Sequence, residues 1–157
     1  MTALPRIQAD PRETVLAFPR CTTSGRLVQP HPLNESQRME LDRLRWLALR
    51  ARLAPRPNLE RACFLLAGGT DVSLQRYSNA FFRGLAEHAN REMVFYRPGT
   101  KVASDDETWL LRLVSAWREG EEKAAGALVS WRVREPQRRW MRFLTAGLTK
   151  ALDETAV

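Results

Sequence analysis

Apolar residues recur at helical spacing along most of the chain after residue 33, and this pattern predicts about six helices. The first helix is expected between Asn34 and about Leu53. The Asn34 side chain suits the N-cap position, and Gln37 follows three residues later, where it can complete a capping box. Two prolines come within four residues of Leu53, and proline cannot continue a helix.

The first helix carries two apolar stripes on roughly opposite sides. One stripe consists of Leu41, Leu44, Leu47, Ala48 and Ala51, and the other of Trp46, Leu49 and Leu53. Arginines fill the positions between them, with Arg38, Arg45 and Arg52 on one side and Arg43 and Arg50 on the other. A helix that is apolar on two sides either lies between layers of its own domain or meets a partner, and both alternatives stay open.

The second and third helices are predicted on either side of a glycine pair. The second follows Asn58 and is expected to bury Leu59, Ala62, Cys63, Phe64, Leu65 and Leu66. Gly68-Gly69 should end it, because glycine readily adopts the left-handed conformation just past a helix. Asp71 is expected to cap the third helix, which continues to about Asn90 through Leu74, Tyr77, Phe81, Phe82 and Leu85.

The run Met93–Tyr96 looks like a strand, but four residues followed by Pro98-Gly99 cannot make a sheet alone, so we expect an extended loop. After it, Ser104-Asp105-Asp106-Glu107 predicts a capping box at the start of a fourth helix. Its three carboxylates fall where the helix dipole is positive. The expected apolar face of this helix is Trp109, Leu110, Leu113, Val114 and Trp117.

Two more helices complete the pattern. Glu119-Gly120 should end the fourth helix, and Glu121-Glu122 should begin a fifth, which carries Ala124, Ala125, Leu128, Val129 and Trp131. Pro136 suits the first turn of the last helix. There one face carries Trp140, Phe143, Leu144, Leu148, Ala151 and Leu152, and the other Arg138, Arg142, Thr145 and Thr149.

These elements predict an all-α protein, an irregular bundle of about six helices that forms one domain over residues 34–157. Residues 1–33 hold five of the nine prolines and are expected to form a flexible, extended arm. The arm contains a short apolar patch around Val15, Leu16 and Phe18. This patch either docks on a partner or lies against its own domain.

Targeting and cysteine patterns indicate a cytoplasmic protein. The N-terminus has no apolar run that suits a signal peptide, and no stretch approaches the ~20 apolar residues that cross a bilayer. We therefore expect no membrane partner. Cys21 and Cys63 are too few and too far apart for a disulfide framework or a zinc knuckle, and Cys63 is expected to be buried.

Charge is the strongest guide to partners. The formal net charge is +7 on 157 residues, and only three of the 25 basic residues are lysine. Codon usage in a GC-rich genome can explain arginine in place of lysine, but it does not explain a surplus over acids. Residues 104–130 carry three basic groups and six acids, whereas the rest of the chain carries 22 and 12. This polarity favours nucleic acid or an acidic protein as the partner.

The basic segment 131–142 is the main candidate for contact with nucleic acid. Guanidinium groups clamp phosphates, and an exposed tryptophan could stack on an unpaired base. The candidate residues are Arg132, Arg134, Arg138, Arg139 and Arg142. The same interpretation extends to Arg43, Arg45, Arg50 and Arg52 of the first helix, of which Arg43 and Arg50 enter the candidate set. The alternative is a solvated helix face whose tryptophans, Trp140 above all, belong to the core.

Other chemistries are poorly supported. The second and third helices have the order of a helix-turn-helix, but Phe64 and Phe81-Phe82 are too bulky for one and favour a core hairpin. Adjacent carboxylates on a helix diverge, so capping explains residues 105–107 better than a metal does. His88 and Glu92 are four apart on one helical face but lack a third ligand. No nucleophile motif or phosphate-binding glycine loop occurs. We therefore expect no catalytic residue, metal or cofactor.

Two functional hypotheses lead, and an enzyme that would depend only on His88 and Glu92 is the third choice. The first is a non-catalytic regulatory protein that associates with nucleic acid through its arginine-rich helix faces. The alternative is an adaptor that binds an acidic protein through the arm and the second stripe of the first helix, using Val15, Leu16, Phe18, Trp46, Leu49 and Leu53. A dimer formed through the first helix also stays open.

Overall fold

The computed structural model describes residues 32–55, 58–68 and 73–156. In order, its helices are α1 (Glu35–Leu53), α2 (Leu59–Ala67), α3 (Leu74–His88), α4 (Asp105–Arg118), α5 (Glu122–Arg132), the short 3-10 helix η1 (Glu135–Gln137) and α6 (Arg138–Glu154). The predicted all-α bundle is confirmed. The proline-rich arm, with Val15, Leu16 and Phe18, lies outside the described residues and stays a prediction.

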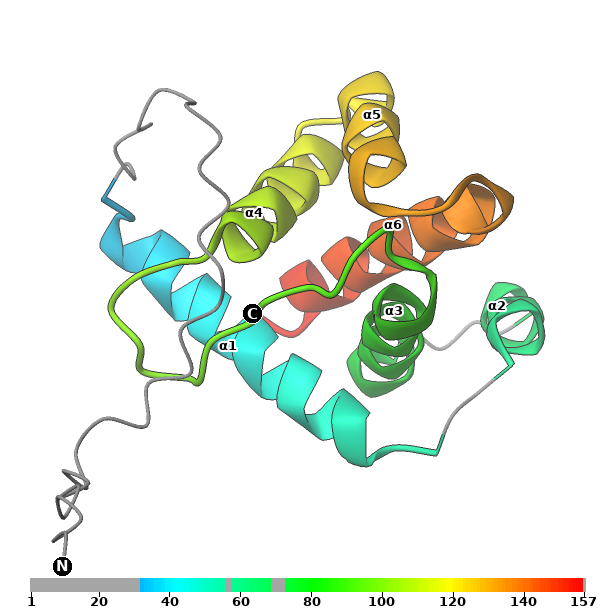
Figure 1. Cartoon of the computed structure of the whole chain (residues 1–157), viewed down its shortest axis with the longest axis horizontal. Coiled ribbons are helices and arrows are strands. Elements are labelled where there is room, and N and C mark those ends of the chain that lie inside the picture. The colour runs from blue at the N-terminus through cyan, green and yellow to red at the C-terminus, as the bar shows by residue number, and fades with distance from the viewer. Residues whose placement is uncertain (1–31, 56–57, 69–72, 157) are drawn as a thin grey trace, which may run out of the picture. The chain divides into compact units, whose positions relative to one another are not determined.

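Helix α6 runs through the middle of the bundle and contacts α2, α3, α4 and α5, while α1 packs on α3 and α4 (Figure 1). The centre of the core lies where α4 meets α6. There Leu110, Leu113 and Val114 of α4 and Met141, Leu144 and Leu148 of α6 are fully buried. None of the helices in the described part of the chain has the length and apolar character needed to cross a bilayer.

The ends of α1 lie where the sequence predicts them. The Gln37 amide donates to Asn34 Oδ1 at 2.8 Å, and the Asn34 amide donates to Gln37 Oε1 at 3.0 Å, which completes the capping box. The helix ends at Leu53. All five residues of the first apolar stripe are buried: Leu41, Leu44, Leu47, Ala48 and Ala51.

Two other helix ends differ from the prediction. Helix α3 is capped by Ser73, whose hydroxyl accepts from the Arg76 amide; Asp71 lies outside the described residues. Pro136 lies in η1 rather than in the first turn of α6, because the chain makes a separate 3-10 turn before the helix begins at Arg138. By contrast, Gly68 is the C-cap of α2, so a glycine ends this helix as predicted; its own φ is −81°, and Gly69 lies outside the described residues.

Several side chains predicted for the core are exposed, and two predicted for the surface are buried. Phe64 and Leu65 are exposed, because the short helix α2 buries only the face that carries Cys63 and Leu66. Thr145 and Thr149 lie inside, where their hydroxyls donate to the carbonyls of Met141 and Thr145 at 2.5 and 2.9 Å. These local hydrogen bonds satisfy the hydroxyls and make burial tolerable.

The segment between α3 and α4 is extended, as predicted, and contains no strand. An isolated bridge pairs its first residue, Ala89, with Val133. The flanking hydrogen bonds run from the Asn90 amide to the Arg132 carbonyl at 2.7 Å and from the Arg134 amide to the His88 carbonyl at 3.0 Å. The segment is thereby joined to the turn between α5 and η1.

A buried charge network fixes the rest of this segment and corrects the prediction for Arg45. The Arg45 side chain is only 2% exposed, and Glu107 is fully buried beside it. Arg45 Nε and Nη2 donate to the two Glu107 oxygens at 2.7 and 2.9 Å. Arg45 also donates to Asp42 and to the carbonyls of Thr100 and Val102. It is therefore a structural residue that holds the loop against α1.

Capping alone does not explain the acidic run 105–107. Glu107 does complete the capping box, since it accepts from the Ser104 amide at 2.9 Å, but it also accepts from the Tyr96 amide at 2.7 Å. Asp106 is buried and accepts from both terminal nitrogens of Arg91, at 2.7 and 2.9 Å. Only Asp105 is exposed, as a plain helix-end carboxylate would be.

Candidate nucleic-acid interface

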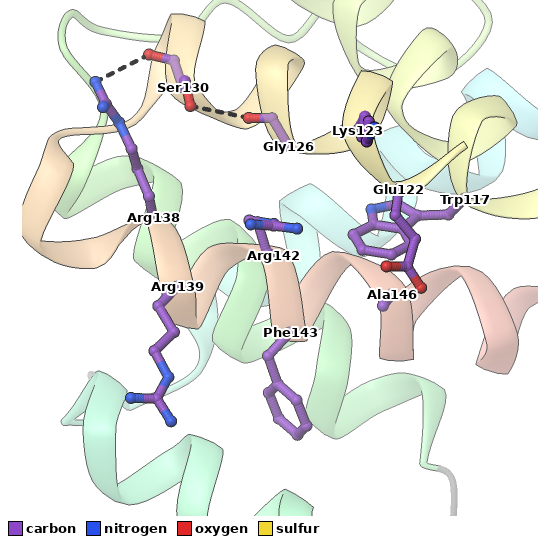
Figure 2. Close-up of a pocket in the computed structure, with 10 residues that line it drawn as sticks. All are labelled: Trp117, Glu122, Lys123, Gly126, Ser130, Arg138, Arg139, Arg142, Phe143 and Ala146. Atoms are coloured by element: carbon purple, nitrogen blue, oxygen red, sulfur yellow. Dashed lines mark hydrogen bonds between the residues drawn. The ribbon is translucent and has the colours of Figure 1, made fainter. Parts of the chain in front are cut away.

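A groove of 630 Å³ lies along the α5–α6 side of the bundle (Figure 2). We call it the basic groove. Four cationic side chains line it, from both helices, with one acidic side chain among them. The lining residues are Trp117, Glu122, Lys123, Gly126, Ser130, Arg138, Arg139, Arg142, Phe143 and Ala146.

The fold brings these charges together through helix spacing and one glycine. Arg138, Arg142 and Ala146 follow one another at four-residue intervals, which places them along the same side of α6. Gly126 stands opposite on α5. A Cβ atom at that position would lie 3.3 Å from Arg142 Cζ, so the glycine leaves space for the guanidinium between the two helices. Figure 2 shows Arg142 in that space.

Arg138 is largely committed to the fold. Its Nε donates to the Val133 carbonyl at 3.0 Å and its Nη2 to the Ser130 carbonyl at 3.2 Å, so it satisfies the C-terminal end of α5. Ser130 in turn donates to the Gly126 carbonyl at 2.9 Å. Because a helix C-terminus carries partial negative charge, this interaction also offsets part of the positive charge of Arg138.

The other three cations of the groove are free. Lys123, Arg139 and Arg142 are exposed, and none forms an ion pair within the described ranges. Arg139 lies over the Trp140 ring, with its Cζ 5.6 Å from the ring centroid. That cation–π interaction orients the guanidinium and leaves its charge in place. All three groups can therefore bind an anion without breaking an internal ion pair.

Trp117 lines the groove, whereas Trp131 on α5 is not one of its lining residues. Trp117 lies in its wall, and its indole Nε1 is buried without a partner among the described residues, whereas Trp109 Nε1 donates to the Leu128 carbonyl at 2.8 Å. Trp131, next to Ser130 on α5, is 69% exposed. Trp140 packs on the core, as predicted, and its ring centroid lies 5.8 Å from that of Phe64.

The remaining candidate arginines lie elsewhere. Arg132 Nε lies 3.2 Å from Asp106 Oδ1, at ion-pair distance but without hydrogen-bond geometry. Arg134 lines a second cleft of 560 Å³ beside α1 and α3. Arg43 Nη1 donates to the Leu152 carbonyl at 3.2 Å and Nη2 to the Thr155 hydroxyl, near the end of α6. Arg50 is exposed on α1. The structure thus groups Arg138, Arg139 and Arg142 and separates the others from them.

Sequence reasoning missed Lys123, Trp117 and Gly126 as groove residues. Residues 104–130 are acidic as a block, and this net charge hides the single lysine that faces the arginines. An antiparallel pairing of α5 with α6 would have revealed it, because Lys123 lies one turn before Gly126. His88 and Glu92 also differ from the prediction: α3 ends at His88, so Glu92 lies in the loop and shares no helical face with it.

The part of the chain that the structure describes contains no group of three or more His, Cys, Asp or Glu residues arranged to hold a metal ion. No protein-family model matches this chain, and neither does any curated protein or solved structure.

Proposed function

We propose that this protein is a non-catalytic regulatory protein that associates with nucleic acid through the basic groove. One observation carries the proposal: Lys123, Arg138, Arg139 and Arg142 line a single groove in which Glu122 is the only acid. A linear polyanion is the partner that best matches several cations spread along a groove, because each phosphate bound releases counterions from the nucleic acid.

The ion pairs of the bundle leave this charge available. Within the described residues, the arginines paired with carboxylates are Arg45, Arg91, Arg118 and Arg132. The carboxylates in these ion pairs belong to α1, α4 and α6. None of them pairs with Lys123, Arg139 or Arg142. Other exposed arginines, among them Arg76, Arg97 and Arg112, also lack an ion pair among the described residues, so the proposal depends on the grouping of cations in the groove and not on net charge.

Trp131 favours single strands over a duplex. Its indole is exposed on the helix that carries Lys123 and Ser130, outside the residues that line the groove, so it can offer a flat surface to an unpaired base. Base stacking on an aromatic side chain contributes about 1–3 kcal/mol and tolerates any base. With phosphates held by arginine and lysine, the expected binding has little sequence preference.

The test compares two triple variants that lose the same charge. Lys123→Ala/Arg139→Ala/Arg142→Ala empties the groove of its free cations and spares Arg138, which supports α5. Arg76→Ala/Arg97→Ala/Arg112→Ala removes three exposed arginines from α3, the loop and α4. Binding of a labelled single-stranded oligonucleotide is measured by fluorescence anisotropy over a series of salt concentrations.

We expect the groove variant to bind at least about tenfold more weakly. Its salt dependence should be shallower by about 0.7 for each phosphate that it no longer neutralises. The control variant should retain most of the affinity. The proposal fails if the full-length protein does not bind the oligonucleotide at low salt. It also fails if both variants weaken equally, because net charge alone would then explain the binding.

A further inference from the structure

Helix α1 exposes a row of large apolar side chains on the side that faces away from the bundle. Met39, Trp46 and Leu53 are 70%, 59% and 89% exposed, and Leu49 is partly exposed between the last two. We call these four residues the outer stripe. It includes the predicted stripe Trp46, Leu49 and Leu53, and the structure adds Met39. Nothing in the described part of the chain covers it.

The spacing of the outer stripe suits a single partner helix. Met39, Trp46 and Leu53 are each seven residues apart, and Leu49 falls three residues after Trp46. These are three a positions and one d position of a coiled-coil seam, in which one helix buries a narrow apolar row against another. The earlier d positions hold Glu35 and Asp42, and the Asp42 carboxylate accepts from Arg45 Nη1 and from the Gly99 amide. Seven residues drift by only about 20° on an α-helix, so the row stays straight over the length of α1.

Both margins of the outer stripe are cationic. Arg38 and Arg52 flank it on one side and Arg50 on the other, at the positions next to the a and d residues. All three are exposed and make no ion pair among the residues described. In coiled coils these flanking positions select the partner through charge. A matching helix therefore carries carboxylates beside its apolar row.

The buried charge network fixes the loop before α4 next to α1. The Val102 carbonyl accepts from Arg45 Nη2 at 2.8 Å, which holds the loop beside α1 at the level of Trp46. The Val102 side chain is itself exposed, and so is Lys101 before it.

We propose that the outer stripe is the docking surface for an amphipathic helix of another protein, with acidic residues flanking its apolar row. A second copy of this chain fits less well, since pairing α1 with itself places Arg38, Arg50 and Arg52 of one copy against those of the other. Like charges at these positions oppose association. This surface is separate from the basic groove, and the proposal does not depend on binding of nucleic acid.

The probe is a designed helical peptide of about three heptads, with leucine at the a and d positions and glutamate at the flanking ones. Its counterpart carries lysine in place of glutamate. Anisotropy of each labelled peptide is measured with the full-length protein. We expect the glutamate peptide to bind and the lysine peptide to bind at least about tenfold more weakly, a difference of about 1.4 kcal/mol or more.

Variants locate the binding. Trp46→Ser should lower the affinity for the glutamate peptide at least about tenfold, because it removes a central aromatic anchor. Leu53→Ser is a second stripe variant that is safe for folding, because Leu53 is 89% exposed. Arg38→Ala/Arg50→Ala/Arg52→Ala should remove the preference for glutamate. Two controls should bind like the parent: Leu65→Ser, an exposed leucine on α2, and the groove variant Lys123→Ala/Arg139→Ala/Arg142→Ala.

Five results would overturn the proposal. The peptides could bind equally well or not at all, or Leu53→Ser and Trp46→Ser could leave binding unchanged. Light scattering could show a dimer that Trp46→Ser dissociates, which would assign the stripe to self-association. Finally, the protein could bind phosphatidylglycerol vesicles through Trp46 and ignore the peptide, which would assign it to a lipid surface.

Discussion

Arg45 uses all three of its guanidinium nitrogens inside the protein, on two carboxylates and two backbone carbonyls. The hydrogen bond to Glu107 raises the pKa of Arg45 above its usual value although burial opposes this, so the group stays charged. A buried charge of this kind is tolerable only while its partner remains. Glu107→Gln is therefore expected to lower the free energy of unfolding by about 3–5 kcal/mol, measured by urea denaturation.

A surface pair provides the comparison. Glu40 pairs with Arg118, whose side chain is about one-third exposed, so Glu40→Gln should cost less than about 1 kcal/mol. The double change Arg45→Met/Glu107→Leu should be less destabilising than Glu107→Gln, because it leaves no charge unpaired. Equal destabilisation by Glu107→Gln and Glu40→Gln would contradict this account of the network.

Cys63 offers a second prediction for a single side chain. Burial raises the pKa of its thiol to about 11. In a Cys21→Ser background, we expect the native protein to react with a disulfide reagent at pH 8 only as fast as it unfolds, because the reactive thiolate is absent. Absorbance of the released thiol follows the reaction. A rate equal to that of the urea-unfolded protein would contradict a buried, protonated thiol.

The same shift predicts how stability depends on pH. The folded state holds the Cys63 proton more tightly than the unfolded state, so the stability that this thiol contributes is present below about pH 9. It is lost as pH rises through about 11. The decline in the free energy of unfolding over that range should be smaller in Cys63→Ala, which has no thiol to titrate. Identical pH profiles for the two proteins would exclude this contribution.

At the scale of elements, the crossing of α3 over α6 depends on Gly147. A Cβ atom there would overlap the ring of Tyr77 on α3. Gly147→Ala is therefore expected to destabilise by about 1–3 kcal/mol despite the gain in helix propensity. Gly126→Ala is the matched control, since its Cβ would meet only the flexible end of Arg142. Thermal unfolding of both variants tests the difference, and a stabilised Gly147→Ala would contradict the packing described.

The sequence predicted most helix boundaries well, because capping and helix breaking depend on residues that are close together in the chain. The capping boxes of Asn34/Gln37 and Ser104/Glu107 join residues three apart, and a glycine pair or prolines mark the breaks. Failures arose where the partner is distant. Arg45 and Glu107 are 62 residues apart, so helix periodicity placed Arg45 with the surface arginines. The exposure of Phe64 likewise depends on how little of α2 reaches the core.

The basic groove could be predicted only in part for the same reason. Arg138, Arg139 and Arg142 come from one helix, and their grouping follows from their spacing. Lys123 joins them across the packing of α5 on α6, which no local pattern encodes. Arg43 and Arg132 were equally basic in sequence, yet the fold directs them to the end of α6 and to Asp106.

At the scale of the whole molecule, the basic groove and the outer stripe belong to different helices. We expect them to bind independently. The affinity for the glutamate peptide should change less than about twofold when the groove is saturated with oligonucleotide. The reason is that salt at physiological ionic strength weakens the electrostatic interaction between the charges of the two sites, with a Debye length of about 8 Å. Anisotropy of the labelled peptide, titrated with and without unlabelled oligonucleotide, measures this. A larger change would mean that the ligands compete or that the sites are coupled.

The close approach of Gly147 to Tyr77 also has an evolutionary consequence. A lineage that replaces the glycine is expected to keep more stability if it also accepts a smaller residue at position 77, since either change alone leaves a clash or a void. The two positions should therefore drift as a pair among descendants of this sequence. A collection of such descendants in which they vary without regard to each other would show that the two helices can slide apart.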